Sequence, residues 1–382
     1  MKILLLATGT VRSSLTARLV NIGREQVRRG HEVILIAPSS DKYTDFKRER
    51  LSKLEGMTIV QPAQLSTRFQ ALNFLPYLLA ATWQAWRQQA DIIHLYKPTP
   101  ITIVGLFAGL RRRTKIVLDM DDLGSLVMAR EGNPAWKVHL VDIAEHLAAR
   151  YAGAIITASS YLRDYYRGLY PTKPILWVPN GVTALDPGSA IDAPPITFIG
   201  SLNDLSLITP LIDALPQVRA ALPSTRPLLQ IIGDGVQRPQ LRQLVQSRDL
   251  EAAVIFSPGW ISLDKLAGQV SAGTIGYCCV PDDATYRAAS SQKVFNYLSL
   301  GVIPVVNQVG DLPHYVENGV SGYIVGADLA ATLITALTDD AGRAAKLTAG
   351  RAYLEANFLW STLAQRIETF YASQFSTSEV IR

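Results

Sequence analysis

The chain has 382 residues, of which 48% are hydrophobic, 18% charged and 8% aromatic. A chain of this length is longer than a single hydrophobic core usually supports, and its composition is too apolar for a disordered protein. We therefore expect about two globular domains. The 26 glycines and 21 prolines show no fixed period, which excludes collagen-like, solenoid and low-complexity chains. The two cysteines, Cys278 and Cys279, are adjacent, which excludes an ordinary structural disulfide and a cysteine-based zinc site.

The net charge of +5 is distributed unevenly along the chain. Residues 1–182 hold 24 Lys and Arg against 14 Asp and Glu, a balance of +10, whereas residues 183–382 hold 13 against 18, a balance of −5. Three basic clusters carry much of the excess: Arg28-Arg29, Lys47-Arg48 with Arg50, and Arg111-Arg112-Arg113 with Lys115. A basic half suits an anionic membrane surface, nucleic acid or an acidic substrate, and the charge alone does not choose among them.

Membrane spans and leader sequences are not predicted. The longest apolar stretches, 74–83 and 101–110, are shorter than the roughly 18 residues that a transmembrane helix needs. The opening apolar run is also shorter than a signal-peptide core of roughly 7–15 residues. We therefore expect a cytoplasmic protein, with a peripheral position at the inner face of the membrane as an alternative.

The first half alternates strand-like and helix-like segments. Ser13 or Ser14 is expected to cap a helix that Gly30 ends, and another helix-like stretch lies around 100–110. The expected strands are 2–7, 31–36, 91–95, 115–119 and 154–157. This alternation predicts an α/β domain with a parallel sheet.

The second half repeats this organisation after an expected linker. Residues 181–195 are rich in Pro, Gly, Ala and Asp, which is typical of a connection between domains. The expected strands that follow are 196–200, 228–233, 254–256, 274–277 and 302–306. The sequence therefore predicts two doubly wound Rossmann-like domains facing across a cleft, with ligands at the carboxyl ends of the strands.

Six short motifs occur in an order that resembles the GT-B glycosyltransferases of family 4, and they cover nearly the whole chain. They are Gly30-His31-Glu32-Val33, Asp91-Ile92-Ile93-His94, Val178-Pro179-Asn180-Gly181-Val182, Phe198-Ile199-Gly200-Ser201-Leu202, Ile232-Gly233-Asp234-Gly235 and the stretch from Ser290 to Gly301. Each motif alone is unspecific, and the signal lies in their order and spacing.

The resemblance implies transfer of a sugar from a nucleotide-diphosphate donor to a glycan, lipid-linked sugar or small-molecule acceptor, with retention and without a metal or a cofactor. It also implies an acceptor domain over 1–182, a donor domain over 183–359, and a helix over 360–382 that crosses back to the first domain. On the donor side it places Gly200, Ser201, Gly233, Gly235, Ser290, Ser291 and Asn296.

The stretch 287–301 carries the physical argument for a donor site. Ser290-Ser291 leads into a helical pattern, and the free N–H groups and positive dipole of a helix start suit a diphosphate. Lys293 lies in the first turn, where a cation is unfavourable unless an anion binds nearby, and Arg287 offers a second, forked contact. The alternative is an ordinary surface lysine.

The same stretch departs from the family pattern. Family members commonly have two glutamates eight positions apart, one near the transferred sugar and one on the donor ribose, and the matching residues here are Ala288 and Asn296. Asn296 can still hydrogen-bond a ribose hydroxyl, whereas Ala288 cannot. Relatives also have an Arg and a Lys after the first strand of this domain, where this chain has Ser201-Leu202-Asn203-Asp204.

Three carboxylates, Asp119, Asp121 and Asp122, end the strand near residue 119. Many relatives place a histidine that faces the transferred sugar where Asp121 stands. We take Asp121, Asp119 and Lys293 as candidate catalytic residues, and Asp122 as an acceptor-side residue. A carboxylate at this place can hydrogen-bond a sugar hydroxyl, or accept a proton if its pKa is raised. Two alternatives remain for these aspartates: one of them caps a helix or turn, or they bind a metal ion, for which the pattern is weak evidence.

The first loop supplies the other acceptor-side candidates, Gly9, Thr10 and Arg12, because it follows the first strand and glycine permits close approach. It contains no dinucleotide fingerprint. The five histidines show no metal-ligand spacing and are interpreted as structural.

Residues 68–87 combine aromatics and leucines with flanking arginines. They suit either a membrane-surface segment that reaches a lipid-linked acceptor or a helix packed in the core. We favour the core, because Pro76 is expected to interrupt a long interfacial helix.

Three functions remain open. The first is a family 4 glycosyltransferase, which binds a nucleotide sugar and no nucleic acid. The second is a non-catalytic GT-B binding or scaffold protein, which Ala288 and the missing cations favour. The third is a sugar-nucleotide epimerase on the same fold, although the sequence shows no clear acid and base pair.

Overall fold

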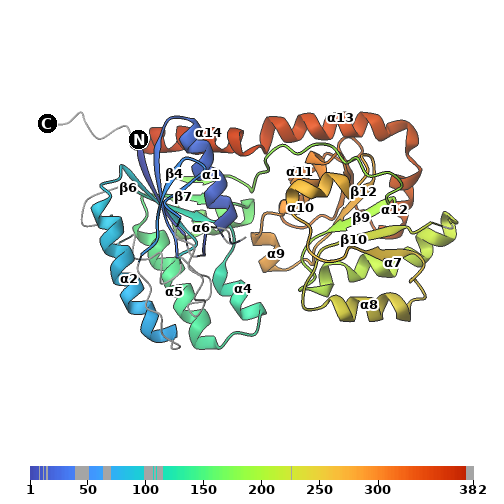
Figure 1. The fold of residues 1–382 in the computed structure, drawn as a ribbon, viewed down its shortest axis with the longest axis horizontal. Coiled ribbons are helices and arrows are strands. Elements are labelled where there is room, and N and C mark those ends of the chain that lie inside the picture. Colours follow the sequence, from blue (N-terminus) through green and yellow to red (C-terminus); the bar gives the residue numbers. More distant parts are fainter. Residues whose placement is uncertain are drawn as a thin grey trace. The chain divides into compact units, whose positions relative to one another are not determined.

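The computed structural model describes residues 1–375 except Thr8, Arg12, Ser14, Leu15, 39–50, 63–69, 99–105, 107–108, 110–114 and Thr225. The chain forms two compact units (Figure 1). The N-terminal unit comprises residues 1–180, the short segment Ala288–Ser290 and the chain from Trp360 on. The C-terminal unit comprises Gly181–Arg287 and Ser291–Leu359.

The N-terminal unit is built on an eight-stranded sheet in the order β3-β4-β2-β1-β5-β6-β7-β8. Its strands are β1 (Lys2–Leu6), β2 (Glu32–Ile36), β3 (Lys53–Leu54), β4 (Met57–Val60), β5 (Ile92–Tyr96), β6 (Lys115–Met120), β7 (Ala154–Thr157) and β8 (Ile175–Trp177). All neighbours pair in parallel except β3 and β4. The parallel sheet expected for this half is confirmed, and β3, β4 and β8 are strands that the sequence patterns did not reveal.

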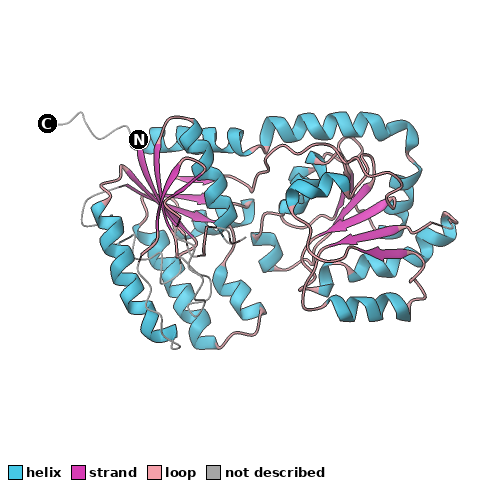
Figure 2. Cartoon of the chain, in the orientation of Figure 1, coloured by secondary structure: helices cyan, strands magenta, loops and turns pink. Residues whose placement is uncertain are grey.

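Helices cover both faces of this sheet (Figure 2). They are α1 (Ala17–Arg28), α2 (Gln70–Arg87), α4 (Gly124–Arg130), α5 (Ala135–Tyr151), α6 (Ser160–Leu169) and α14 (Trp360–Phe375). Because side chains alternate along a strand, Ile3 and Leu5 of β1 pack in one apolar cluster with α1 and α14, while Leu4 and Leu6 pack in the other. That second cluster includes side chains of α2, α5 and α6.

Two local predictions for this unit are corrected. The N-cap of α1 is Thr16, whose side chain makes no capping bond, rather than Ser13, and Ser14 lies outside the described residues. Pro76 does not interrupt α2, which runs continuously from Gln70 to Arg87 because loss of one backbone donor does not outweigh the packing of Ala81 and Ala85 in the core. Gly30 follows the end of α1 at a φ of +86°, the left-handed conformation that glycine adopts at a helix end.

The C-terminal unit contains a six-stranded, fully parallel sheet in the order β11-β10-β9-β12-β13-β14. Its strands are β9 (Ile196–Ile199), β10 (Leu229–Ile232), β11 (Val254–Phe256), β12 (Ile275–Cys278), β13 (Ile303–Val306) and β14 (Tyr323–Ile324). Its helices are η2 (Leu205–Leu207), α7 (Thr209–Ala221), α8 (Arg238–Ser247), η3 (Leu263–Gly268), α9 (Ala284–Ala288), α10 (Gln292–Ser299), α11 (Leu312–Tyr315), α12 (Leu329–Thr338) and α13 (Asp340–Asn357). Both units are therefore Rossmann-like, as predicted.

None of the helices within the described ranges is both long and apolar enough to cross a bilayer. Of the three basic clusters, Lys47-Arg48 with Arg50 and Arg111-Arg112-Arg113 lie outside the described residues. In the remaining one, Arg28 pairs with Glu25 and Arg29 pairs with Glu368.

Candidate functional site

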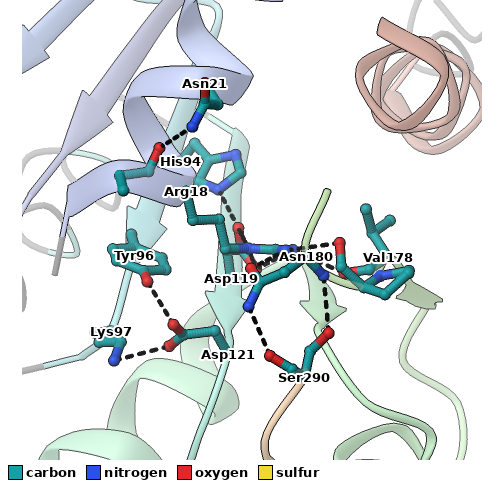
Figure 3. Close-up of polar contacts among 12 residues, drawn as sticks. Arg18, Asn21, His94, Tyr96, Lys97, Asp119, Asp121, Val178, Asn180 and Ser290 are labelled. Carbon is teal, nitrogen blue, oxygen red and sulfur yellow. Dashed lines mark hydrogen bonds and ion pairs between the residues drawn. The ribbon is translucent and has the colours of Figure 1, made fainter. Parts of the chain in front are cut away.

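A buried ion pair lies under the carboxyl edge of the N-terminal sheet (Figure 3). The Arg18 guanidinium of α1 forms a fork with Asp119 of β6, with Nε 3.0 Å from Oδ2 and Nη2 3.0 Å from Oδ1. The remaining donors of Arg18 reach the carbonyls of Val178 and Pro179, at 2.9 and 3.0 Å, and Oδ1 of Asn180, at 3.2 Å. Burial would lower the pKa of Arg18, but Asp119 outweighs this effect and the net shift is upward.

His94 of β5 completes the pairing of Asp119. Its Nε2 lies 3.1 Å from Asp119 Oδ2, and its Nδ1 hydrogen-bonds Tyr371 of α14. Burial would raise the pKa of Asp119, but Arg18 and His94 together lower it. Both carboxylate oxygens of Asp119 are therefore engaged within the protein, and this side chain joins three elements of the fold, β6, α1 and β5. His94 is structural, as predicted from the sequence.

The network also fixes the segment at Asn180. The backbone N–H of Asn180 donates to Ser290 Oγ at 3.0 Å, and its amide Nδ2 donates to the Ser290 carbonyl at 3.1 Å (Figure 3). Two of the motifs noted in the sequence, around Val178-Pro179-Asn180 and Ser290, thus meet in one hydrogen-bonded arrangement. Ser290 lies in the N-terminal unit and is buried by these contacts.

Asp121 stands just beyond the end of β6, among polar side chains from β5. Tyr96 donates to Asp121 Oδ2 at 2.5 Å, and the Lys97 ammonium lies 3.1 Å from Asp121 Oδ1. Lys97 also pairs with Asp122 at 2.8 Å. Burial, and then repulsion by Asp122, raise the pKa of Asp121 to about 6, against the opposing effects of Lys97 and Tyr96. The pKa of Asp121 thus lies above the usual range of an aspartate, at about 6.

The geometry of the sheet explains why these side chains meet. Tyr96 and Asp119 are partners in the parallel pairing of β5 with β6, so the residues that follow each strand emerge side by side. Arg18, Tyr96 and Lys97 are not among the site residues predicted from the sequence. For the last two, a signal existed: both follow the predicted strand 91–95 directly, at the edge where Asp121 was expected.

The loop after β1 is only partly described. A Cβ atom on Gly9 would come within 3.1 Å of Ser13 Oγ and 3.2 Å of Thr16 Oγ1, so a side chain there would crowd the turn. The Thr10 carbonyl accepts from the Ser13 N–H at 3.0 Å. Arg12, the third acceptor-side candidate of this loop, lies outside the described residues.

In the C-terminal unit, Lys293 occupies the second position of α10 and is turned inward. Its ammonium group lies 4.4 Å from the centre of the Phe198 ring of β9. Burial lowers the pKa of Lys293, and no neighbouring group fully offsets that effect. Across the described part of the chain, no oxygen accepts a hydrogen bond from this ammonium group and no carboxylate pairs with it.

Glycines make room for this arrangement at the ends of β9 and β10. A Cβ atom on Gly200 would lie 2.6 Å from Lys293 Cε. Gly233 has a φ of +151°, and a Cβ there would lie 1.9 Å from the Gly200 carbonyl oxygen. A Cβ on Gly235 would lie 2.4 Å from the Leu202 carbonyl carbon. Close backbone approach therefore requires glycine at 233 and 235, whereas a side chain at 200 would displace the flexible end of Lys293.

The other donor-side candidates differ from one another in exposure and in hydrogen-bond partners. Ser201 is exposed beyond β9, and Ser291 precedes α10 with its Oγ 3.1 Å from Cys278 Sγ. Asn296 Oδ1 accepts from Gln292 at 3.3 Å. The Arg287 guanidinium forms a fork with Asp282, at 2.6 and 2.8 Å, and this ion pair is exposed.

Ala288, at the position where family members commonly have a glutamate, is fully buried in the apolar cluster of the N-terminal unit that includes Leu118 and Ile155. It offers no polar atom to a ligand. Among the residues that the structure describes, no three His, Cys, Asp or Glu side chains come together in a way that could hold a metal ion.

Comparison with known families identifies both halves of the chain. The family model described as "Glycosyl transferase 4-like domain" matches residues 15–181, and the model described as "Glycosyl transferases group 1" matches residues 193–339. The chain belongs to the group 1 glycosyltransferases. This agrees with the resemblance inferred from the ordered sequence motifs.

A curated relative of this group 1 glycosyltransferase is the D-inositol 3-phosphate glycosyltransferase of Stackebrandtia nassauensis, which is 26% identical over 246 residues. The match covers 58% of this chain and 54% of the relative, so the chain aligns with about half the length of that protein.

Solved structures share the fold at low sequence identity. Sucrose-phosphate synthase from Thermosynechococcus elongatus superposes with a TM-score of 0.75 at 16% identity, covering 99% of this chain and 100% of the other. Anabaena HepE, solved in complex with UDP and glucose, superposes with a TM-score of 0.70 at 18% identity, covering 98% and 100%. These likenesses establish the GT-B architecture.

Proposed function

We propose that this protein transfers a sugar from a nucleotide-diphosphate donor to an acceptor hydroxyl, with retention and without a metal ion or a resident cofactor. The acceptor classes implied by the resemblance are a glycan, a lipid-linked sugar or a small molecule. The C-terminal unit holds the donor in this proposal, and the N-terminal unit contributes Asp121. Solved relatives whose titles name bound UDP or UDP-glucose support a nucleotide-sugar donor.

The observation that carries the proposal is that the Lys293 ammonium group has no ion-pair partner in the described part of the chain. The Lys293 side chain is half-buried, and the lack of an ion pair is unfavourable for a charge withdrawn from water. The group lies at the start of α10, beside the glycine-lined ends of β9 and β10. The positive end of the helix dipole and the free N–H groups of its first turn favour an anion at the same place. A diphosphate supplies the negative charge that this arrangement lacks.

In the reaction, the bond between the sugar C1 and the β-phosphate oxygen breaks, and a bond between C1 and the acceptor oxygen forms. Negative charge grows on the departing diphosphate, so Lys293 stabilises the transition state more than the bound donor. The acceptor hydroxyl passes its proton to the departing phosphate. This use of Lys293 provides the positive charge that a metal ion supplies in other transferases.

Asp121 has a different role in this proposal. Its ionised carboxylate accepts a hydrogen bond from a hydroxyl of the transferred sugar and orients that sugar. Tyr96 and Lys97 hold the carboxylate in place from one side. Asp119 is not assigned a contact with substrate, because Arg18 and His94 already engage both of its oxygens.

A thermal-shift panel of UDP, GDP, ADP and dTDP, each with its common sugar nucleotides, tests the proposal. A ligand at 100 times its dissociation constant stabilises the folded protein by about 2.7 kcal/mol, which is readily measured. We expect one base to raise the melting temperature and the matching sugar nucleotide to be turned over. A panel in which no nucleotide shifts the melting temperature would contradict the proposal.

A non-catalytic binding protein is the second candidate, and Ala288 favours it. Its methyl group lies in an apolar cluster, at the position where a glutamate near the transferred sugar is expected from the family. The discriminating measurement is nucleotide release from the donor identified by the panel. Binding without release, even by slow hydrolysis, would favour this second function over transfer.

A further inference from the structure

Lys97, the residue that follows β5, has an unusual backbone conformation. Its φ is +50°, in the left-handed region that residues other than glycine rarely adopt. The next residue is Pro98, and a residue before proline favours an extended backbone. In the described part of the chain, the other non-glycine residues with a positive φ are all exposed: Glu55, Gln89, Asp192 and Asp249. Of these five described residues, only Lys97 is partly buried, with 19% of its side chain exposed.

The Lys97 ammonium group contacts two carboxylates. The backbone N–H of Lys97 donates to the Asp119 carbonyl at 3.1 Å, so the hydrogen bonding between β5 and β6 continues to residue 97. The Nζ atom of Lys97 lies 3.1 Å from Asp121 Oδ1, a contact that Figure 3 shows, and 2.8 Å from Asp122 Oδ2. A cation at this place offsets the repulsion between the two neighbouring carboxylates.

Lys97 is the main support for a negative charge on Asp121. Burial and then Asp122 raise the pKa of Asp121, whereas Lys97, Tyr96 and Arg18 lower it, and Lys97 does so most. The Arg18 guanidinium is held by its fork with Asp119. In the described part of the chain, Lys97 is therefore the cation that contacts Asp121 directly.

We propose that Lys97 is a positioning residue for Asp121: the fold accepts a strained backbone at residue 97 to hold an ammonium group against Asp121, and this group keeps the Asp121 carboxylate ionised. An ionised carboxylate accepts a stronger hydrogen bond from a sugar hydroxyl than a neutral carboxyl group does. Glycine at this position would relieve the backbone strain, but it has no ammonium group. The inference rests on the proposed use of Asp121 in sugar transfer, and it adds the residue that prepares Asp121 for that use.

The first test is the pH dependence of kcat/KM for donor hydrolysis. We expect Lys97→Met to move the midpoint of the rise in kcat/KM from about 6 to about 7 or higher, because an adjacent cation no longer favours the carboxylate. At a pH of about 6, kcat/KM should therefore fall by about fivefold or more, and at a pH of about 9 it should return to within about twofold of the unmodified enzyme. A purely structural role of Lys97 would lower kcat/KM at every pH.

Two further variants control for the loss of a positive charge. Lys97→Arg keeps a cation beside both carboxylates, so its midpoint should stay near 6. Lys2→Met is the matched control, because Lys2 pairs with Glu32 at 2.9 Å at the amino end of β1, the opposite edge of the same sheet. It should leave the midpoint unchanged. An equal midpoint in Lys97→Met and the unmodified enzyme would overturn the proposal, as would an equal displacement in Lys2→Met.

Urea unfolding tests the ionisation of Asp121 without turnover, so it separates a failure of this inference from a failure of the proposed function. A carboxyl group whose pKa is raised by folding contributes stability that is lost as the pH rises to that pKa. The difference in stability between Asp121 and Asp121→Asn should therefore stop changing near pH 6 in the unmodified chain, and near about pH 7 or above in Lys97→Met. A displaced window supports the proposal even if no sugar nucleotide is turned over. The same window in both backgrounds would overturn it even if the enzyme transfers sugar.

The backbone strain is tested by two variants that both lack the ammonium group. Glycine ordinarily destabilises a folded chain relative to alanine, because it gains more freedom on unfolding. At a φ of +50° the order reverses, so we expect Lys97→Gly to unfold at a higher urea concentration than Lys97→Ala. A lower urea midpoint for Lys97→Gly would overturn the claim that the fold accepts strain at this position.

Discussion

Folding withdraws two cations from water, Arg18 of the N-terminal unit almost completely and Lys293 of the C-terminal unit in part, and the two differ in what surrounds them. Arg18 finds a carboxylate, two backbone carbonyls and an amide oxygen of Asn180. Lys293 finds the face of Phe198. Accordingly, the pKa of Arg18 is raised by Asp119 despite burial, whereas burial lowers the pKa of Lys293.

The difference shows how a charged side chain that stabilises the fold is distinguished from one that is suited to bind a ligand. A buried charge whose hydrogen bonds are complete stabilises one arrangement of the chain. A buried charge that lacks an anion is a cost to the fold, and a ligand with the opposite charge removes that cost. Lys346 provides the reference within the C-terminal unit, because it lies 5.2 Å from the Tyr323 ring centre but also pairs with Asp339 at 2.7 Å.

The largest expected effect is the loss of stability when Arg18 is replaced. Arg18→Ala leaves the Asp119 carboxylate buried without its main partner, and we expect the free energy of unfolding to fall by about 3–5 kcal/mol. The exposed ion pair of Arg167 with Asp164 is the control, and Arg167→Ala should change the free energy of unfolding by less than about 0.5 kcal/mol. Denaturant unfolding measures both values. A loss below about 1 kcal/mol in Arg18→Ala would mean that the network contributes little stability.

Sequence patterns predicted the two parallel sheets because each central strand is a continuous apolar run. They did not predict β3, β8 or β14, which have only two or three residues and little periodicity. Arg18 was equally hidden: in the sequence it is one arginine on an amphipathic helix. Its role depends on Asp119 and Asn180, which lie 101 and 162 positions away.

The next effect concerns Glu145, whose carboxyl group is buried at the start of α4. Burial, opposed by the bonds from Ser125 and Gly124, raises its pKa from 4.5 to about 7. The folded state therefore binds this proton more tightly than the unfolded state, so the contribution to stability is fully present below pH 4.5 and is lost as the pH rises to 7. Relative to Glu145→Gln, we expect the unmodified protein to lose about 3 kcal/mol across that window.

Urea unfolding of both proteins at several pH values measures this difference directly. Glu145→Gln retains an oxygen for the Gly124 N–H, so its own stability should be insensitive to this titration. Parallel pH dependence in the two proteins would show that Glu145 does not titrate in this range.

A smaller effect is expected at Asp121, which lies on the functional side of the comparison. Removing the charge from a hydrogen bond to a sugar hydroxyl costs about 2 kcal/mol, so Asp121→Asn should lower kcat/KM for donor hydrolysis by about 30-fold. Because Asp121 acts in its ionised form and has a pKa of about 6, kcat/KM of the unmodified enzyme should rise as the pH increases through 6. The variant should lack that rise.

Asp122→Asn is the matched control, because Asp122 shares the partner Lys97 with Asp121. It should retain the rise in kcat/KM with pH, but with the midpoint moved to lower pH, because repulsion by Asp122 helps to raise the pKa of Asp121. If both variants lose it, the profile reports the charge on Lys97 or its surroundings and not the Asp121 carboxylate.

The candidate site was predicted only in part because a sequence pattern locates a residue type and not its partners. The stretch from Ser290 to Gly301 correctly placed Lys293 at a helix start. The same reasoning could not show that Asp282 engages Arg287, or that Ser290 bonds Asn180 rather than standing open beside Lys293. Those outcomes depend on loop conformations that no periodicity encodes.

The most direct measurement is the affinity for UDP, and for the diphosphate of any other base that the panel prefers, by isothermal titration of three proteins. These are the unmodified chain, Lys293→Met and the control Lys346→Met. For each protein, the affinity for the diphosphate is compared with the affinity for the uncharged nucleoside. We expect Lys293→Met to weaken diphosphate binding by about tenfold or more, to leave nucleoside binding unchanged and not to destabilise the fold, and we expect Lys346→Met to bind normally. Equal diphosphate affinity in Lys293→Met and the unmodified chain would contradict a diphosphate site at Lys293.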